Sequence, residues 1–396
     1  MKILVSGASI AGPAVAYWLQ RYGFDVTVVE RAGQLRGGGY PIDIRATALE
    51  VVKRMGVHPQ LRAAHINTQA LSFLNPDGSV VARLQPDAVA HGDETEDLEV
   101  PRGDLAKVLH DVTRQRVDYR FNDSITRLDE DADGVVVRFA SGETERFALV
   151  VAADGVHSSS RALKFGPEEP LHRYLGYCFA GFTMPNEFGL SHEGVVWNQP
   201  GRGVALYAVQ DRPELFGFLC VTRDEPPFEA FRNPEAQREL VAARFEGDGW
   251  QVPRVVEAMR TADDLFFDMV TQIRMPRWSS GRLVLAGDAA HAPSFLTGQG
   301  SSTALVGAYV LAGELAAEFG SGTGDHRAAF ERYEQITRPF VEANQNLVSP
   351  GQANLIPSTA AALAARNAMF QKISALPSDE QPAHWAIDLP GYHLPD

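Results

Sequence analysis

The sequence has few cysteines, and their placement limits what thiols can do in this protein. Its two cysteines, Cys178 and Cys220, lie far apart, and neither belongs to a CxxC motif or has a histidine cluster beside it. This pattern favours reduced thiols in a cytoplasmic protein. A disulfide between the two residues is the alternative that the sequence leaves open.

Runs of basic residues and long apolar segments are also missing. The 36 basic and 50 acidic side chains give a net charge of −14 without any Lys/Arg-rich run, so nucleic acids and other polyanions are not expected as partners. The apolar stretch 3–19 is interrupted by Gly7 and Gly12 and continues into a second β-rich run, so we expect no membrane anchor. With 396 residues, of which 45% are hydrophobic and 22% charged, the chain can form two domains with real cores.

The first thirty residues predict a βαβ unit. Residues 2–7 form an apolar β run, residues 11–23 have helical spacing, and residues 24–30 form a second buried strand that ends on Glu30. The turn Gly7-Ala8-Ser9-Ile10-Ala11-Gly12 matches the GxGxxG fingerprint except for Ser9, and Glu30 has the spacing of a carboxylate that binds ribose hydroxyls. These features predict a dinucleotide site, and the alternative is a simple tight turn. A nucleophilic serine is excluded, because GxSxG would need a glycine where Ala11 stands.

A second strand-to-helix unit occupies residues 282–315. Its apolar strand ends on Gly287-Asp288, which places the carboxylate at the carboxyl end of a parallel strand, where open α/β sheets bind ligands. Gly298-Gln299-Gly300 then leave free backbone amides at the start of a helix near Ser301, whose positive end favours anionic groups such as a reduced flavin ring. In the alternative interpretation, Asp288 only caps a turn and the glycines only bend a loop.

The middle of the chain is rich in strand signals. Runs with turn residues between them fill roughly residues 170–275, and a hairpin is expected around residues 75–78. We interpret them as a mainly antiparallel sheet inserted into the first domain. A helix is expected to start near Arg102. The DEDADG turn at residues 129–134 imitates a calcium loop, but Ala140 stands where a bidentate glutamate would be needed, so an exposed hairpin is expected.

Helical patterning returns near the C-terminus, at residues 326–348 and 358–373. Pro339 predicts a kink in the first helix and Ser358 a cap for the second. An apolar stripe of Leu363, Phe370 and Ile373 is expected to pack back across the two domains rather than recruit a partner. The tail from Pro377 onward is Pro-rich and expected to be irregular.

Three segments together resemble the flavin fingerprints of the class A flavoprotein monooxygenases, which have the para-hydroxybenzoate hydroxylase-like fold. They are GASIAG with VVER (residues 7–12 and 28–31), VVAADGVHSSSR (residues 150–161) and LAGDAAHAPSFLTGQGSSTAL (residues 285–305). Residues 37–57 are also similar to a segment of the tetracycline destructases and related antibiotic-modifying monooxygenases. The resemblance implies an enzyme that uses FAD, NAD(P)H and O2 to hydroxylate an aromatic or polyketide-like small molecule through a flavin hydroperoxide.

The resemblance assigns roles to positions that match the family's motifs. It implies that Glu30 binds the adenosine ribose, that Arg102 contacts ribityl or phosphate oxygens, and that Asp154-Gly155 serves the pyrophosphates of FAD and NAD(P)H. Ser9, Ser301-Ser302 and Gly307 depart from the family's pattern and put local hydrogen bonds in doubt. The implied cofactor-binding residues are Gly7, Ser9, Ile10, Ala11, Gly12, Glu30, Arg31, Arg45, Arg102, Asp154, Gly155, Gly287, Asp288, Pro293, Gly298, Gln299, Gly300 and Ser301.

The expected architecture is an α/β fold: a Rossmann-like FAD-binding domain, an inserted, mainly antiparallel β-sheet substrate domain, and C-terminal helices. Phe179, Tyr207, Phe218 and Phe295 are candidates for substrate binding, with plain core packing as the alternative for each. The expected boundaries are 1–70, 98–168 and 275–335 for the FAD-binding domain, 71–97 and 169–274 for the substrate domain, 336–374 for bridging helices and 375–396 for the tail.

No nucleophile, acid/base pair or metal site is expected, because the cofactor would carry the chemistry. His157 and His291 are interpreted as loop histidines satisfied by nearby backbone, since no metal spacing accompanies them. Two other functions remain open. One is a different FAD oxidoreductase, a reductase or a halogenase, although Trp197 and Trp278 are solitary and form no WxWxxP motif. The other is a non-catalytic flavoprotein that binds or sequesters a drug.

Overall fold

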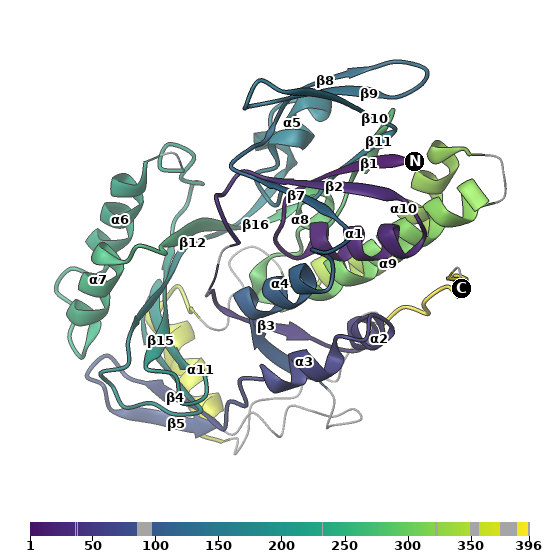
Figure 1. The fold of residues 1–396 in the computed structure, drawn as a ribbon. Coiled ribbons are helices and arrows are strands. Elements are labelled where there is room, and N and C mark those ends of the chain that lie inside the picture. Colours follow the sequence, from purple (N-terminus) through teal and green to yellow (C-terminus); the bar gives the residue numbers. More distant parts are fainter. Residues whose placement is uncertain are drawn as a thin grey trace.

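The chain folds into a mixed α/β structure in which two large sheets lie side by side (Figure 1). The computed structural model describes residues 1–35, 37, 39–84, 97–231, 233–320, 324–348, 356–372 and 386–394. One sheet is mostly parallel and belongs to the predicted nucleotide-binding part. The other is mostly antiparallel and belongs to the predicted substrate-binding part. The expected fold class is confirmed.

The mostly parallel sheet brings four strand ends to one edge. Within the described residues its order is β17-β18-β11-β1-β2-β7, and every neighbouring pair is parallel except β17 with β18. The carboxyl ends of β1, β2, β11 and β18 therefore lie side by side. The strands are β1 (Lys2–Ser6), β2 (Asp25–Glu30), β7 (Asp118–Phe121), β11 (Leu149–Ala152), β17 (Ser279–Ser280) and β18 (Leu283–Leu285).

Layers on both faces explain why these strands are apolar along their whole length. All of β11 and β18 is buried, as is β1 after Lys2. Helix α1 (Ala11–Arg21) packs on β1 and β2, and α9 (Gly300–Gly320) packs on α1, which forms a helical layer on one side (Figure 1). On the other side lie α5 (Ser159–Phe165) and a small antiparallel sheet of β8 (Ile125–Glu130), β9 (Val135–Phe139) and β10 (Thr144–Phe147).

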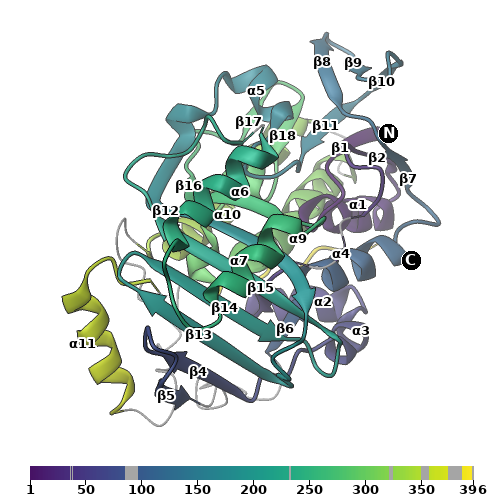
Figure 2. The ribbon, with the colours of Figure 1, turned by 90° about the vertical axis from the view of Figure 1, so that its left-hand side faces the viewer.

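The second large sheet has the order β16-β12-β15-β14-β13-β4-β5 in the described part of the chain. Its pairs are antiparallel apart from β13 with β4, and helices α6 (Pro234–Ala242) and α7 (Val252–Thr261) cover one face (Figure 2). Much of the opposite face lines the cavity between the sheets. The strands are β4 (Ala70–Leu74), β5 (Val80–Leu84), β12 (His172–Pro185), β13 (Glu193–Gln199), β14 (Arg202–Ala208), β15 (Glu214–Thr222) and β16 (Phe266–Ile273).

Short elements connect the two sheets. Strands β3 (Pro41–Ile44) and β6 (Leu98–Pro101) pair in an antiparallel ribbon, which leads into helix α4 (Arg102–Asp111). Helices α2 (Thr47–Arg54) and α3 (His58–Ala63) follow β3. The predicted helix start at Arg102 is confirmed, as are the hairpin between β4 and β5 and the hairpin at residues 129–134.

The two C-terminal helices pack on different parts of the molecule. Helix α10 (His326–Gln345) packs on α9 and continues through Pro339, and α11 (Ala360–Phe370) packs on β5 and β13. The predicted Ser358 cap is wrong, because Thr359 has the extended backbone and its side chain accepts the Ala362 amide at 3.1 Å. Leu363 and Phe370 are buried as expected, but α11 packs on the antiparallel sheet rather than across both domains. Ile373 lies outside the described residues.

The described tail, residues 386–394, contains no helix or strand, yet it is held on the helical layer. The Thr47 hydroxyl accepts the Ile387 amide at 2.9 Å, the Tyr309 hydroxyl donates to the Pro390 carbonyl at 2.7 Å, and Tyr392 donates to Glu314 at 2.6 Å. These bonds attach the tail to α2 and α9, so an irregular segment contributes to the packing of the nucleotide-binding part.

The remaining structural expectations concern thiols and membranes. Cys178 and Cys220 are both free and buried, so the disulfide alternative is excluded. Among the described helices, none combines the length and apolar character that crossing a bilayer requires.

Gly12 makes the strand-to-helix turn possible, and its replacement tests the turn. A Cβ atom at Gly12 would lie 1.9 Å from the Gly7 carbonyl oxygen, which is backbone and cannot move aside. We predict that Gly12→Ala lowers the free energy of unfolding by at least about 3 kcal/mol, the upper end for overpacked sites. Gly320→Ala is the control, since nothing lies within 4 Å of its Cβ position. Equal denaturant midpoints for both variants would contradict this account of the turn.

Candidate active site

One cavity of about 1280 Å³ runs between the two large sheets. It extends from the carboxyl ends of β1, β2 and β11 to the aromatic face of the antiparallel sheet. Typical pockets for a single drug-sized ligand measure about 300–1,000 Å³. The cavity therefore has room for an extended dinucleotide together with part of a second molecule.

The loop between β1 and α1 is a tight turn at one end of this cavity. Gly7 has a φ of +105°, and a Cβ atom there would lie 2.4 Å from the Ala153 carbonyl oxygen, so only glycine fits. The carboxylate of Glu30 accepts the Ala8 amide at 2.9 Å and the Ala32 amide at 2.8 Å. The loop and the end of β2 are thus joined by the acid that the fingerprint predicts at this position.

Ser9, the departure from the GxGxxG pattern, has a partner. Its hydroxyl accepts a hydrogen bond from Nη2 of Arg102 at 2.6 Å. Arg102 begins helix α4 and lines the same cavity. The serine therefore positions the guanidinium at the turn, where it can bind phosphate or ribityl oxygens through its remaining donors.

Asp288 follows β18 at the same sheet edge, is partly buried and lines the cavity. Burial raises the pKa of its carboxyl, and the Arg102 guanidinium opposes that shift. The next loop contains Gly298 in the left-handed region, at φ +65°, where a Cβ atom would lie 2.9 Å from Oδ2 of Asp43. Glycine keeps the chain close to the cavity at the start of α9, whose first amides favour negative charge.

The Asp154 carboxylate forms hydrogen bonds within its own loop. Its carboxylate accepts the Ser160 amide at 2.9 Å, the Ser159 hydroxyl at 3.3 Å and the Ser158 hydroxyl. These bonds cap the start of α5. Gly155, at φ +89°, follows at the cavity wall.

Most predicted residues line the cavity, and four do not. Gly12 packs against the backbone of Gly7, Gly287 against Ala11, Arg45 pairs with Asp43 at 3.1 Å, and the side chain of Gln299 is turned away, with 3% of the residue exposed. Lining residues from the predicted set are Gly7, Ser9, Ile10, Ala11, Glu30, Arg31, Arg102, Asp154, Gly155, Asp288, Pro293, Gly298, Gly300, Ser301, Phe179, Tyr207, Phe218 and Phe295.

Three of the four substrate-binding candidates form one aromatic cluster. The rings of Phe179 and Phe218 stack with centroids 5.0 Å apart, and Phe295 packs edge-on against both at 4.9 and 5.3 Å. Phe266, which was not predicted, lies 5.7 Å from Phe179. Tyr207 lies farther along the same wall, and burial raises the pKa of its hydroxyl.

Several acids of the cavity wall were missed. Asp43 lies beside Gly298, Glu99 precedes Arg102 by three positions, and Asp268 lies in β16 on the cavity side. Burial, reinforced by the charge of Asp43, raises the pKa of Glu99 to about 7. Asp268 had a signal in the sequence, since it is an acid within the apolar run LFFDMVTQI, where an unpartnered carboxylate would be costly.

The interpretation of the two loop histidines is wrong in both cases. His157 is held by carboxylates, since Nδ1 lies 3.1 Å from Glu168 and Nε2 lies 3.0 Å from Asp268. His291 has no hydrogen-bond partner among the described residues for either ring nitrogen. Burial lowers the pKa of His291 to about 3, and its ring packs against Trp278 at 4.7 Å, so it acts as a neutral core residue.

Similarity to known proteins extends over both sheets. Residues 1–347 match the family described as "FAD binding domain". A flavin-dependent monooxygenase from an unknown prokaryotic organism is 36% identical over 346 residues, which is 87% of each chain. An uncharacterised protein of Mycobacterium tuberculosis is 40% identical over 356 residues, 89% of this chain and 94% of its own. The crystal structure of tetracycline destructase Tet(51) has a TM-score of 0.83 and 31% identity, with 99% of both chains covered.

The buried Glu99 predicts a pH dependence of stability. Its pKa is about 7 in the folded chain against an ordinary 4.5, so between these values the folded state keeps a proton that the unfolded state releases. Wild type therefore loses stability as pH rises from 4.5 to 7, by on the order of 3 kcal/mol. Glu99→Gln removes this loss, so the variant's melting temperature relative to wild type should rise over that range and level off above it.

The control for this measurement is Glu257→Gln, on the exposed surface of α7. Its difference from wild type should stay constant across the pH series, with FAD held at one concentration. A Glu99→Gln difference that also stays constant, or that falls with rising pH, would show that Glu99 is ionised normally in the folded chain.

Proposed function

The chain belongs to the FAD-binding-domain family and is a flavin-dependent monooxygenase of class A, and from this premise we propose that it hydroxylates an aromatic or polyketide-like small molecule. One oxygen atom of O2 would enter a C–H bond of the substrate and the other would leave as water. NAD(P)H would supply the two electrons and be oxidised to NAD(P)⁺. A small-molecule substrate and O2 are thus the expected partners.

The observation that carries this proposal is the single cavity that connects the dinucleotide turn with the aromatic cluster. Residues of the β1–α1 loop and of the Gly298–Gly300 loop line the same space as Phe179 and Phe218. An enzyme of this type must bring cofactor and substrate together while excluding water. An enclosed aromatic wall next to a flavin-sized cradle meets that requirement.

The chain's own residues would bind and orient the cofactor. FAD, when bound, supplies the electron transfer and the activation of O2. Glu30 would bind the adenosine ribose and Arg102 the phosphate or ribityl oxygens, since both line the cavity beside the β1–α1 turn. The N-terminus of α9 would stabilise negative charge on the ring through its free amides. The loop at Asp154-Gly155 is proposed for transient NAD(P)H binding.

The aromatic cluster favours a flat, polycyclic substrate. Offset stacking and edge-to-face contacts with Phe179, Phe218 and Phe295 would orient such a ring system. Tetracycline destructase Tet(51), by its name, acts on a polycyclic antibiotic, which supports antibiotic modification as the role of this chain. Two free, buried thiols are consistent with a cytoplasmic location.

Removal of the Glu30 carboxylate tests the cofactor role. Glu30→Ala should weaken FAD binding at least about tenfold, because the loop loses the acceptor that holds two amides and the ribose loses a charged partner. The measurement is a titration of FAD-free protein, followed by the quenching of flavin fluorescence. Glu143→Ala, in an exposed turn, is the control and should bind FAD as wild type does. Unchanged affinity in Glu30→Ala would remove this residue from the site.

The proposed reaction is tested by product mass. Purified, FAD-loaded protein should consume NADPH faster when polycyclic phenols are added, and the product should gain one oxygen atom that derives from labelled O2 gas. NADPH consumption with hydrogen peroxide as the only product would instead indicate a reductase, and a halogen in the product a halogenase. Tight binding of these compounds without any NADPH consumption would indicate a sequestering protein.

A further inference from the structure

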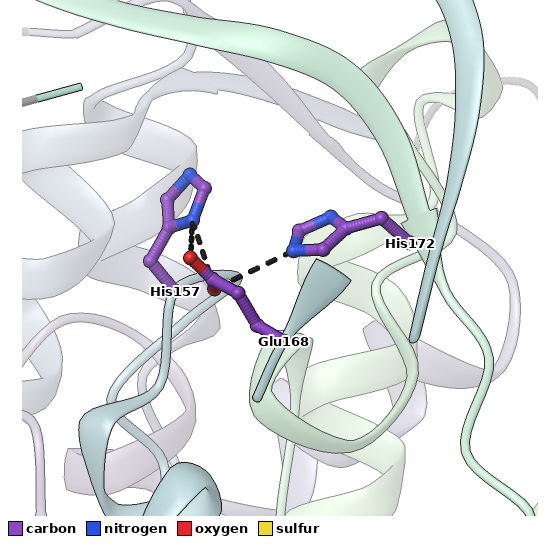
Figure 3. A group of neighbouring side chains, drawn as sticks. All are labelled: His157, Glu168 and His172. Carbon is purple, nitrogen blue, oxygen red and sulfur yellow. Dashed lines mark hydrogen bonds and ion pairs between the residues drawn. The ribbon is translucent and has the colours of Figure 1, made fainter. Parts of the chain in front are cut away.

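A second group of polar side chains lies where the two sheets meet, and it combines two imidazoles with one carboxylate. His157 follows β11, Glu168 lies in the segment after α5, and His172 begins β12 (Figure 3). Nδ1 of His157 lies 3.1 and 3.2 Å from the two Glu168 oxygens, and Nε2 of His172 lies 3.4 Å from Oε2. Figure 3 shows the carboxylate between the two rings.

The outward-facing nitrogen of each ring is already bound by an oxygen. Nε2 of His157 lies 3.0 Å from Oδ1 of Asp268, and Nδ1 of His172 lies 3.2 Å from Oγ1 of Thr271. Histidines that bind metals almost always donate their other ring N–H to a carboxylate, hydroxyl, carbonyl or water, which fixes ring and tautomer. Both rings are therefore oriented so that Nδ1 of His157 and Nε2 of His172 point toward the Glu168 carboxylate.

The spacing of the three ligand atoms suits a small divalent metal. Bonds of about 2.0–2.2 Å at tetrahedral angles place neighbouring ligand atoms about 3.3–3.6 Å apart. The measured separations from Glu168 to the two imidazoles, 3.1 to 3.4 Å, are close to this, and all three ligand atoms lie within 4.8 Å of one another. We propose that Nδ1 of His157, a Glu168 oxygen and Nε2 of His172 bind Zn²⁺ or a similar divalent metal.

Acidic neighbours and access support a cation at this position. The carboxylates of Glu168 and Asp268 both contact His157. Arg161 lies nearby, with Nη2 3.5 Å from Glu168, and donates to the Val156 carbonyl at 2.8 Å. The side chains of His157 and Glu168 are 33% and 29% exposed, so an ion can enter. The His172 side chain, 2% exposed, provides a fixed inner ligand.

Protons compete with the metal for the same ligand atoms. An imidazole must give up the proton at its ligating nitrogen before it binds an ion, so the apparent affinity for Zn²⁺ should rise with pH while protons are released.

The bound ion would link the two sheets. His157 belongs to the loop that follows Asp154-Gly155, whereas His172 and the supporting Asp268 belong to β12 and β16 of the antiparallel sheet. Coordination would fix the distance between that loop and the sheet without any part in flavin chemistry. No sequence motif predicts this site, because the ligands are spaced irregularly and the supporting acid follows about a hundred residues later.

The test uses tag-free, FAD-loaded protein that has been dialysed against a chelator. Calorimetric titration with Zn²⁺ alone, at about pH 7 and about pH 8, should give one equivalent of binding and a tighter constant at the higher pH. The melting temperature should rise with the concentration of Zn²⁺, as for any ligand of the folded state. The bound flavin's visible spectrum reports that the chain is intact.

Variants separate this site from the other histidines of the chain. His172→Gln and Glu168→Gln should each abolish the stoichiometric binding, and Asp268→Asn should weaken it about 10- to 100-fold by releasing the His157 ring. His192→Gln, whose Nδ1 lies 3.1 Å from the Asn67 carbonyl outside this group, is the matched control and should bind as wild type does.

Wild-type protein alone can overturn the proposal, whether or not a variant folds. Substoichiometric binding of Zn²⁺ would mean that the group is a network of hydrogen bonds and ion pairs without a metal. Stoichiometric binding that persists in both His172→Gln and Glu168→Gln would place the ion elsewhere. None of these outcomes bears on the oxygenase assignment, which is tested by product mass.

Discussion

The structure depends on one constraint, the shared edge at which parallel strands end. Strands β1, β2, β11 and β18 run in the same direction, so their carboxyl ends place the β1–α1 turn, Glu30, the Asp154 loop and Asp288 around one space. The antiparallel sheet closes that space with an aromatic wall. Residues that are far apart in the sequence thus form one site, because every strand delivers its following loop to the same place.

Local sequence rules predicted this frame correctly. Apolar runs of strand length, helical spacing and glycine turns are properties of short segments, so the βαβ unit, the Asp288 strand, the helix at Arg102 and the hairpins followed from them. The capping residue of α11 was misplaced by one position, because Ser358 and Thr359 can both cap and only the backbone conformation distinguishes them. Ser9 departs from the fingerprint and puts local hydrogen bonds in doubt, whereas in the structure its hydroxyl accepts a hydrogen bond from Arg102.

Those local rules could not predict contacts between residues that lie far apart in the sequence. Asp43 reaches Gly298 because β3 packs on α9, and His157 meets Asp268 because β16 is the edge strand of its sheet. Such contacts depend on packing between elements that no local pattern encodes. One signal was available in the sequence: a charged residue inside an apolar strand, as at Asp268, indicates that the residue has a partner but does not identify that partner.

The central claim is that FAD and substrate share the cavity between the sheets, and a crystal structure of the protein grown with FAD and a polycyclic phenol tests it most directly. The account predicts electron density for the ribose hydroxyls beside Glu30 and for the flavin ring between the Gly298–Gly300 loop and Phe179. The phenol should lie against Phe218. Density for FAD on any other surface, or a flavin ring separated from the aromatic wall, would contradict the account.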